Sequence, residues 1–142
     1  MLENLYQKSL IERSKSTLNQ GSNPDAEIIF TAYNPLCGDK FTFYLTVQDG
    51  KITSAVFEGH GCSISKASSS ILTEKIIGHN AEMIQSIIRE LNNLIDPNNP
   101  HQPEEITRDT ELLSLSGVRQ YPERKDCVVL GWKELEKILS FL

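Results

Sequence analysis

The sequence predicts an α+β fold in which a three-stranded antiparallel sheet, over residues 26–59, carries helices packed on one face. Apolar and polar residues alternate over residues 41–57 around Asp49-Gly50, which is typical of a β-hairpin with a two-residue turn. After Cys62, apolar residues instead recur at spacings of three and four, which is typical of helices. The chain of 142 residues is short enough for one hydrophobic core, so we expect a single domain over residues 1–142.

The N-terminal part predicts one helix and then one strand. Apolar residues over 2–18 recur at helical spacing, and a polar run that begins at Asn19 ends the pattern. β-Branched and aromatic residues between Glu27 and Tyr33 favour a strand. The following six residues, through Asp39, include a proline and a glycine and predict a turn. We therefore expect Cys37 in a loop.

The hairpin determines which residues meet at the end of the sheet. Pairing outward from the turn places Phe43 opposite Val56. The same pairing brings Asp39 next to the segment Gly59–Cys62 at the open end of the hairpin. Because Cys37 lies two residues before Asp39, the sequence predicts Cys37, Asp39 and Cys62 in one neighbourhood.

The rest of the chain predicts helices. They cover residues 63–77, residues 80–94, one short turn at 111–117, and a long amphipathic segment from residue 122 to the C-terminus. The proline-rich stretch from Asp96 to Pro103 predicts no regular structure. Cys62 falls at the N-terminus of the first of these helices, where free N–H groups and the helix dipole stabilise a thiolate. Cys127 falls near the beginning of the last helix.

Composition and charge narrow the classes of function. The formal net charge of −5 and the pI of about 5.2 provide no cationic field for nucleic acid or an anionic membrane surface. No apolar stretch approaches the roughly 18 residues of a spanning helix, and the N-terminus lacks the pattern of a signal peptide. We therefore expect a cytoplasmic protein with no nucleic-acid and no membrane partner. The odd count of three cysteines argues against a disulfide framework.

Four side chains are candidate metal ligands: Cys37, Asp39, Cys62 and Cys127. Three thiolates and one carboxylate are enough for a tetrahedral Zn²⁺ site. The cysteines do not come in the close pairs of a zinc finger, so each could instead be an isolated buried residue. The expected loop position of Cys37 argues against that alternative, because loops expose their side chains.

Three segments resemble the signature segments of the IscU-like family of iron–sulfur cluster assembly proteins: Asn34–Asp39, Gly59–Ser70 and Arg124–Trp132. Within that family the chain is similar to the SufU branch of zinc-dependent sulfurtransferases. Asp126 stands where the classical IscU scaffold has a histidine directly before its last cysteine, and Tyr121–Lys125 replaces a motif recognised by a chaperone. The segment Ile95–Gly117 looks like the insertion that SufU-like proteins carry ahead of the last helix.

The resemblance implies both a cofactor and partners. It implies one Zn²⁺ bound by Cys37, Asp39, Cys62 and Cys127. It also implies that Cys37 accepts persulfide sulfur from a SufS-like cysteine desulfurase and that downstream Suf assembly proteins receive it. Zinc would keep the thiols deprotonated and block their oxidation.

Two further side chains lie near these residues in the sequence. Arg124, three residues before Cys127, is expected within reach of the cluster, where its guanidinium could stabilise a thiolate or persulfide anion. The alternative for Arg124 is a surface ion pair with Glu123 or Asp126. His60 lies two residues from Cys62 and is a suitable metal ligand, but the family pattern varies there, so we treat it as a rim residue.

Three functions remain in competition at this stage. The first is a sulfurtransferase that carries sulfur from the desulfurase to cluster assembly. The second is a scaffold in which the same ligands hold a transient 2Fe–2S cluster, since thiolates also bind iron. The third is a structural zinc module. Asp39 favours transfer over a structural site, because a closed structural site would normally use a fourth Cys or His.

Overall fold

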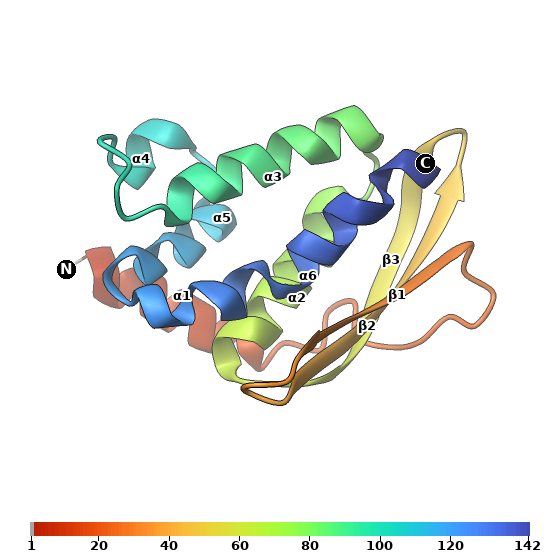
Figure 1. The fold of residues 1–142 in the computed structure, drawn as a ribbon, viewed down its shortest axis with the longest axis horizontal. Helices are drawn as coiled ribbons and strands as arrows, with labels where there is room; N and C mark the ends of the chain where they lie inside the picture. The colour runs from red at the N-terminus through yellow and green to blue at the C-terminus, as the bar shows by residue number, and fades with distance from the viewer. Residues whose placement is uncertain (1) are drawn as a thin grey trace.

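The computed structural model describes residues 2–142, with side chains from Gln7 onward. Three antiparallel strands form one sheet in the order β1-β2-β3: β1 (Ile28–Asn34), β2 (Asp39–Gln48) and β3 (Lys51–His60). The helices gather on one side of this sheet, with α2 (Ser63–Ile76) and α6 (Lys125–Ile138) directly against it (Figure 1). The predicted α+β class with a three-stranded antiparallel sheet is confirmed.

The remaining helices extend the layer away from the sheet (Figure 1). They are α1 (Leu2–Ser14), α3 (Ala81–Ile95), α4 (Pro103–Ile106), α5 (Thr110–Ser114), and the 3₁₀ helices η1 (Leu115–Gln120), η2 (Pro122–Arg124) and η3 (Leu139–Phe141). The short turn expected at 111–117 is therefore longer, because α5 continues directly into η1. None of the helices described here is long and apolar enough to cross a membrane.

The first helix is shorter than the 2–18 that the sequence predicts, because the chain leaves it to bond with the sheet. After α1 the backbone turns at Asn19, whose φ is 60°. The Phe57 N–H donates to the Asn19 carbonyl at 2.9 Å, and the Gly21 N–H donates to the Phe57 carbonyl at 2.8 Å. Residues 19–21 thus cover part of the free edge of β3, where unpaired backbone groups would otherwise face water.

The hairpin turn forms as predicted, but the register beyond it differs. Asp49 and Gly50 both have positive φ, as a two-residue turn of this kind requires. A β-bulge between Thr46 and Val47 then shifts the pairing by one residue.

The predicted pairing of Phe43 with Val56 is therefore wrong, since Phe43 pairs with Phe57. The bulge turns Phe57 toward the helices, where it is buried and stacks on Phe43 with ring centroids 6.1 Å apart. Val56 lies on the other side of the strand and is only partly buried. An unbroken alternation would have buried Val56 instead of Phe57.

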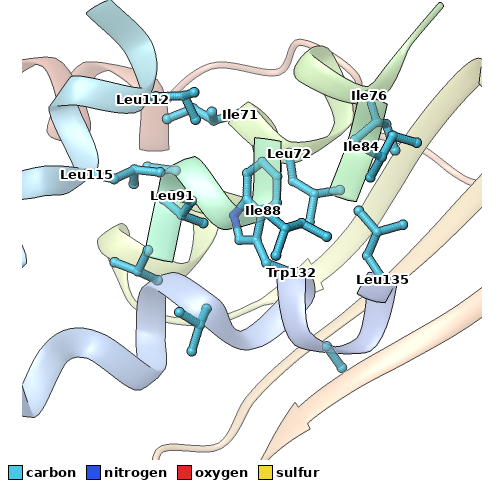
Figure 2. Packing of buried hydrophobic residues seen from close by; sticks show 14 of the residues in the cluster. Ile71, Leu72, Ile76, Ile84, Ile88, Leu91, Leu112, Leu115, Trp132 and Leu135 are labelled. Atoms are coloured by element: carbon cyan, nitrogen blue, oxygen red, sulfur yellow. The ribbon is translucent and has the colours of Figure 1, made fainter. Parts of the chain in front are cut away.

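A buried hydrogen-bond relay joins α2 to α6 within the core. Trp132 of α6 lies among the labelled side chains of Leu72 and Ile88 (Figure 2). Its Nε1–H donates to Ser68 Oγ at 2.9 Å, and Ser68 Oγ donates to the Val128 carbonyl at 2.6 Å. Small serines therefore allow α2 and α6 to lie close together, and this packing places the first turns of both helices at the same end of the sheet.

Candidate metal centre

Three potential metal-donor side chains meet at the end of the sheet. The Sγ atoms of Cys37 and Cys127 and a carboxylate oxygen of Asp39 all lie within 4.8 Å of one another. Cys37 comes from the turn between β1 and β2, Asp39 begins β2, and Cys127 lies in the first turn of α6. The fold thus brings together three of the four candidate ligands from positions far apart in the sequence.

Cys37 is held in a short and well-bonded turn. Asn34 and Asp39 pair across the base of this turn, and the Gly38 N–H donates to the Asn34 carbonyl at 2.8 Å. The Asn34 side chain accepts the Leu36 N–H at 3.1 Å and donates through Nδ2 to Cys37 Sγ at 3.6 Å. The turn therefore positions a thiol that is exposed to solvent.

Asp39 is buried, with 2% of its surface exposed, and only half of its carboxylate is satisfied. Oδ1 accepts the Cys62 N–H at 3.0 Å, whereas Oδ2 has no hydrogen-bond partner. A buried carboxylate oxygen without a partner is costly unless a cation compensates it. The carboxylate also fills the space beside Gly61, since a Cβ there would lie 2.8 Å from Oδ1.

Cys62 is adjacent to the group but is engaged with its own helix. It is the N-cap of α2, with Sγ accepting the Ser65 N–H at 3.4 Å. Burial acts to raise the pKa of the Cys62 thiol, but hydrogen bonds from Ser65 and from the Cys127 thiol outweigh it and lower that pKa. The Cys62 sulfur lies outside the set of donors that are all within 4.8 Å of one another.

The pKa of the Cys127 thiol shifts in the opposite direction from that of Cys62. Burial, followed by the hydrogen bond with Cys62 and the negative charges of Cys62, Asp39 and Cys37, raises the pKa of Cys127 to about 12. The negative charge of these neighbours opposes ionisation of Cys127 as long as no cation compensates it. A cation between them removes that opposition, so the donor set fits a divalent metal. Thiolates with one carboxylate suit zinc or iron better than magnesium or calcium.

Arg124 lies on the Cys62 side of the site. It lines a cavity of about 590 Å³ together with Cys62 and Tyr121, between α1, the start of α2 and the segment η1–η2. Among the described side chains Arg124 forms no ion pair, so the alternative pairing with Glu123 or Asp126 is absent from this structure. His60, also exposed, is outside the group of close donors.

Two residues that support the site were missed by the sequence analysis. Ser65 bonds to Cys62, and Asn34 holds the Cys37 turn. Both had a local signal: a serine in the first turn after a helix N-cap, and an asparagine directly before the proline of a turn.

Comparisons with known proteins bear on the family and the fold of the chain. The family model described as the NifU-like N terminal domain matches residues 5–128. The chain is 36% identical over 136 residues to the iron–sulfur cluster assembly scaffold protein IscU of Thermotoga maritima, covering 96% of the chain and 93% of the relative. It is 31% identical over 136 residues to the zinc-dependent sulfurtransferase SufU of Bacillus subtilis, covering 96% of the chain and 90% of that relative. The crystal structure of FiSufU from Fervidobacterium islandicum AW-1 superposes with a TM-score of 0.80 at 29% identity, covering 94% and 96% of the two chains.

Proposed function

The chain belongs to the family of NifU-like N-terminal domains, which it shares with IscU and SufU proteins, and from this membership we propose a function in sulfur transfer. The protein is a zinc-dependent sulfur acceptor that takes persulfide sulfur from a cysteine desulfurase and supplies it to iron–sulfur cluster assembly. The observation that carries this proposal is the exposed Cys37 thiol beside the buried donors Asp39 and Cys127.

Cys37 is the sulfur acceptor in this proposal. Its thiolate attacks the outer sulfur of a persulfide on the desulfurase. A new S–S bond forms at Cys37 as the S–S bond of the desulfurase breaks, and the bonding pair stays on the departing cysteine as a thiolate. The transferred sulfur keeps its oxidation state, so the step needs no oxidant or reductant.

The residues proposed to hold zinc are Cys37, Asp39, Cys62 and Cys127. When bound, zinc supplies positive charge that keeps the thiols deprotonated near neutral pH. The Cys62 N–H orients the Asp39 carboxylate through Oδ1, which leaves Oδ2 for the metal. Ser65 holds Cys62 at the start of α2.

Arg124 is proposed to stabilise the anionic sulfur during transfer. Its guanidinium has no ion-pair partner among the described residues, and it shares a cavity with Cys62. An always-charged guanidinium can bond to a thiolate or persulfide anion without changing its own protonation state.

A second function, a scaffold for a transient 2Fe–2S cluster, is favoured by one comparison. The Thermotoga maritima relative, at 36% identity, is a scaffold protein, and thiolates serve iron as well as zinc. Asp126, in place of a histidine before Cys127, favours the sulfurtransferase. A purely structural zinc module has less support, because Cys37 is exposed and a carboxylate occupies the position of a stronger fourth ligand.

Metal analysis combined with desulfurase kinetics tests the proposal. We expect a colourless protein with about one Zn²⁺ per chain that increases desulfurase turnover. Cys37→Ala should fold and fail to stimulate turnover, whereas Ser86→Ala, on an exposed face of α3, should behave as the parent. Visible absorption from an iron–sulfur cluster, with no zinc and no stimulation, would support the scaffold instead.

A further inference from the structure

Leu36, the neighbour of Cys37, is unusually exposed for a large hydrophobic side chain. It is 91% exposed, above the 78% of Phe141 and every other large hydrophobic residue described. Its backbone belongs to the turn, because the Leu36 N–H donates to Asn34 Oδ1 at 3.1 Å. The turn therefore holds an apolar group in water directly beside the proposed sulfur acceptor.

The burial of the other donors limits how a partner can reach Cys37. Asp39 and Cys127 are both buried, whereas the turn residues at positions 35–38 are all exposed. A protein that brings a persulfide to Cys37 must therefore approach over this turn. Asn34 bonds to both Leu36 and Cys37, so a surface that contacts the thiol also meets the leucine.

We propose that Leu36 is the docking anchor for the cysteine desulfurase, inserting into an apolar recess beside the cysteine that carries the persulfide. This inference rests on the proposed transfer of sulfur from a desulfurase to Cys37. Single exposed hydrophobic residues are common and mean little alone. Here the exposed leucine lies one residue from the reacting thiol. Burying its side chain in the complex removes apolar surface from water, and this contributes favourable free energy to binding. Leu36 thus positions Cys37 without taking part in the chemistry.

Titration of a cysteine desulfurase with Leu36→Ser tests the anchor, using isothermal titration calorimetry for affinity and turnover for kinetics. We expect about a tenfold weaker affinity, equivalent to about 1.4 kcal/mol, and a matching rise in the half-saturating concentration. Maximal stimulated turnover and metal content should stay at the parental values, because Leu36 is neither a metal donor nor a nucleophile. Leu36→Met should retain the parental affinity, since it keeps an apolar side chain of similar size.

Phe141→Ser provides the matched control. Phe141 is also highly exposed, but it belongs to η3, and the C-terminus that follows η3 lies at the hairpin-turn end of the sheet, opposite the β1–β2 turn (Figure 1). The Phe141→Ser protein should bind the desulfurase with the parental affinity. Parental affinity in Leu36→Ser, or an equal loss in Phe141→Ser, would overturn the anchor while sulfur transfer stands. A parent protein that neither binds nor stimulates the desulfurase would overturn the proposed function and the anchor together.

Discussion

The Cys127 thiol shows how the candidate site depends on the balance of charge around a single residue. Burial and the neighbouring acidic groups raise its pKa to about 12, so it is protonated near neutral pH in the absence of metal. Asp39, within 4.8 Å, contributes a carboxylate oxygen without a partner. Both features are unfavourable in the metal-free protein and become favourable beside a cation.

Metal uptake should therefore release protons. Because a thiol must lose its proton to bind zinc, adding Zn²⁺ to the metal-free protein near pH 8 is expected to release at least the Cys127 proton. Affinity should fall as the pH falls, since protons then compete for the same sulfur atoms. Calorimetric titrations in buffers of different ionisation enthalpy measure the number released. Proton release that is equal in the parent and in Cys127→Ser would show that Cys127 is not a ligand.

Sequence reasoning predicted part of this site. Cys37 and Asp39 are two residues apart, and the hairpin brings the backbone of Cys62 back to Asp39, so local rules sufficed for this part. The position of Cys127 depends on how α6 packs against the sheet, which spacing alone does not determine. The bonding of Cys62 to Ser65 also escaped prediction, because a cysteine N-cap accepts hydrogen bonds that its role as a candidate ligand does not suggest.

At the level of elements, the joint between α2 and α6 keeps two of the candidate ligands together. Cys62 precedes α2 and Cys127 begins α6, so their separation depends on how these helices pack. Ser68 joins the helices by accepting from the Trp132 indole and donating to the Val128 carbonyl. The relay is buried, since Ser68 is 1% exposed and Trp132 is 2% exposed.

Ser68→Ala should destabilise the protein by about 1–3 kcal/mol, because it leaves the buried indole N–H of Trp132 without a partner. Urea denaturation followed by Trp132 fluorescence measures the change in the free energy of unfolding. The exposed Ser86→Ala should change it by less than about 0.5 kcal/mol. Equal stability of Ser68→Ala and the parent would mean that the relay contributes nothing to the joint.

A second set of contacts attaches the N-terminus of α5 to α2. The Lys75 ammonium lies 2.9 Å from Asp109 Oδ2, and Asp109 Oδ1 caps α5 by accepting from Glu111 and Leu112. Burial acts to raise the pKa of Asp109, but these hydrogen bonds and the Lys75 charge outweigh it and hold that pKa below its ordinary 3.8.

The stabilisation from Asp109 should therefore depend on pH in a defined direction. A lowered carboxyl pKa adds stability above pH 3.8 that is lost as the pH falls through the folded value. Asp109→Asn, which keeps the helix cap, should be less stable than the parent by about 1 kcal/mol at pH 7. That difference should shrink as the pH falls below 3.8, as measured by denaturation of metal-free protein, with the exposed Asp25→Asn as control. A difference that stays constant as the pH falls would show that it does not come from the charge of Asp109.

The elements themselves were largely predictable, whereas the register of the hairpin was not. The turn at Asp49-Gly50 and the helix that starts after Cys62 follow from local propensity and periodicity. The bulge between Thr46 and Val47 does not, because Val56 and Phe57 are both apolar and either could face the core. The larger aromatic side chain is the one that the packed helices bury.

At the scale of the whole molecule, the proposed zinc would tie three parts of the chain together: the β1–β2 turn, the start of α2 and the start of α6. A ligand that binds only the native state stabilises it by about 4 kcal/mol at a thousandfold excess over its Kd. Removing the metal with a chelator should therefore lower Tm by roughly 10 °C, as measured by calorimetry. Cys127→Ser should show little or no such shift. A chelator-insensitive Tm in the parent would argue against a metal joining these elements.

The measurement that most directly tests sulfur transfer is the location of the sulfur after the reaction. The protein is incubated with a cysteine desulfurase, its pyridoxal phosphate cofactor and free cysteine, then alkylated, digested and analysed by mass spectrometry. The account predicts one additional sulfur on Cys37, because it is the exposed thiol of the group and lies in a turn between strands. Additional sulfur on Cys127 alone, with Cys37 unmodified, would contradict the account and favour the scaffold function.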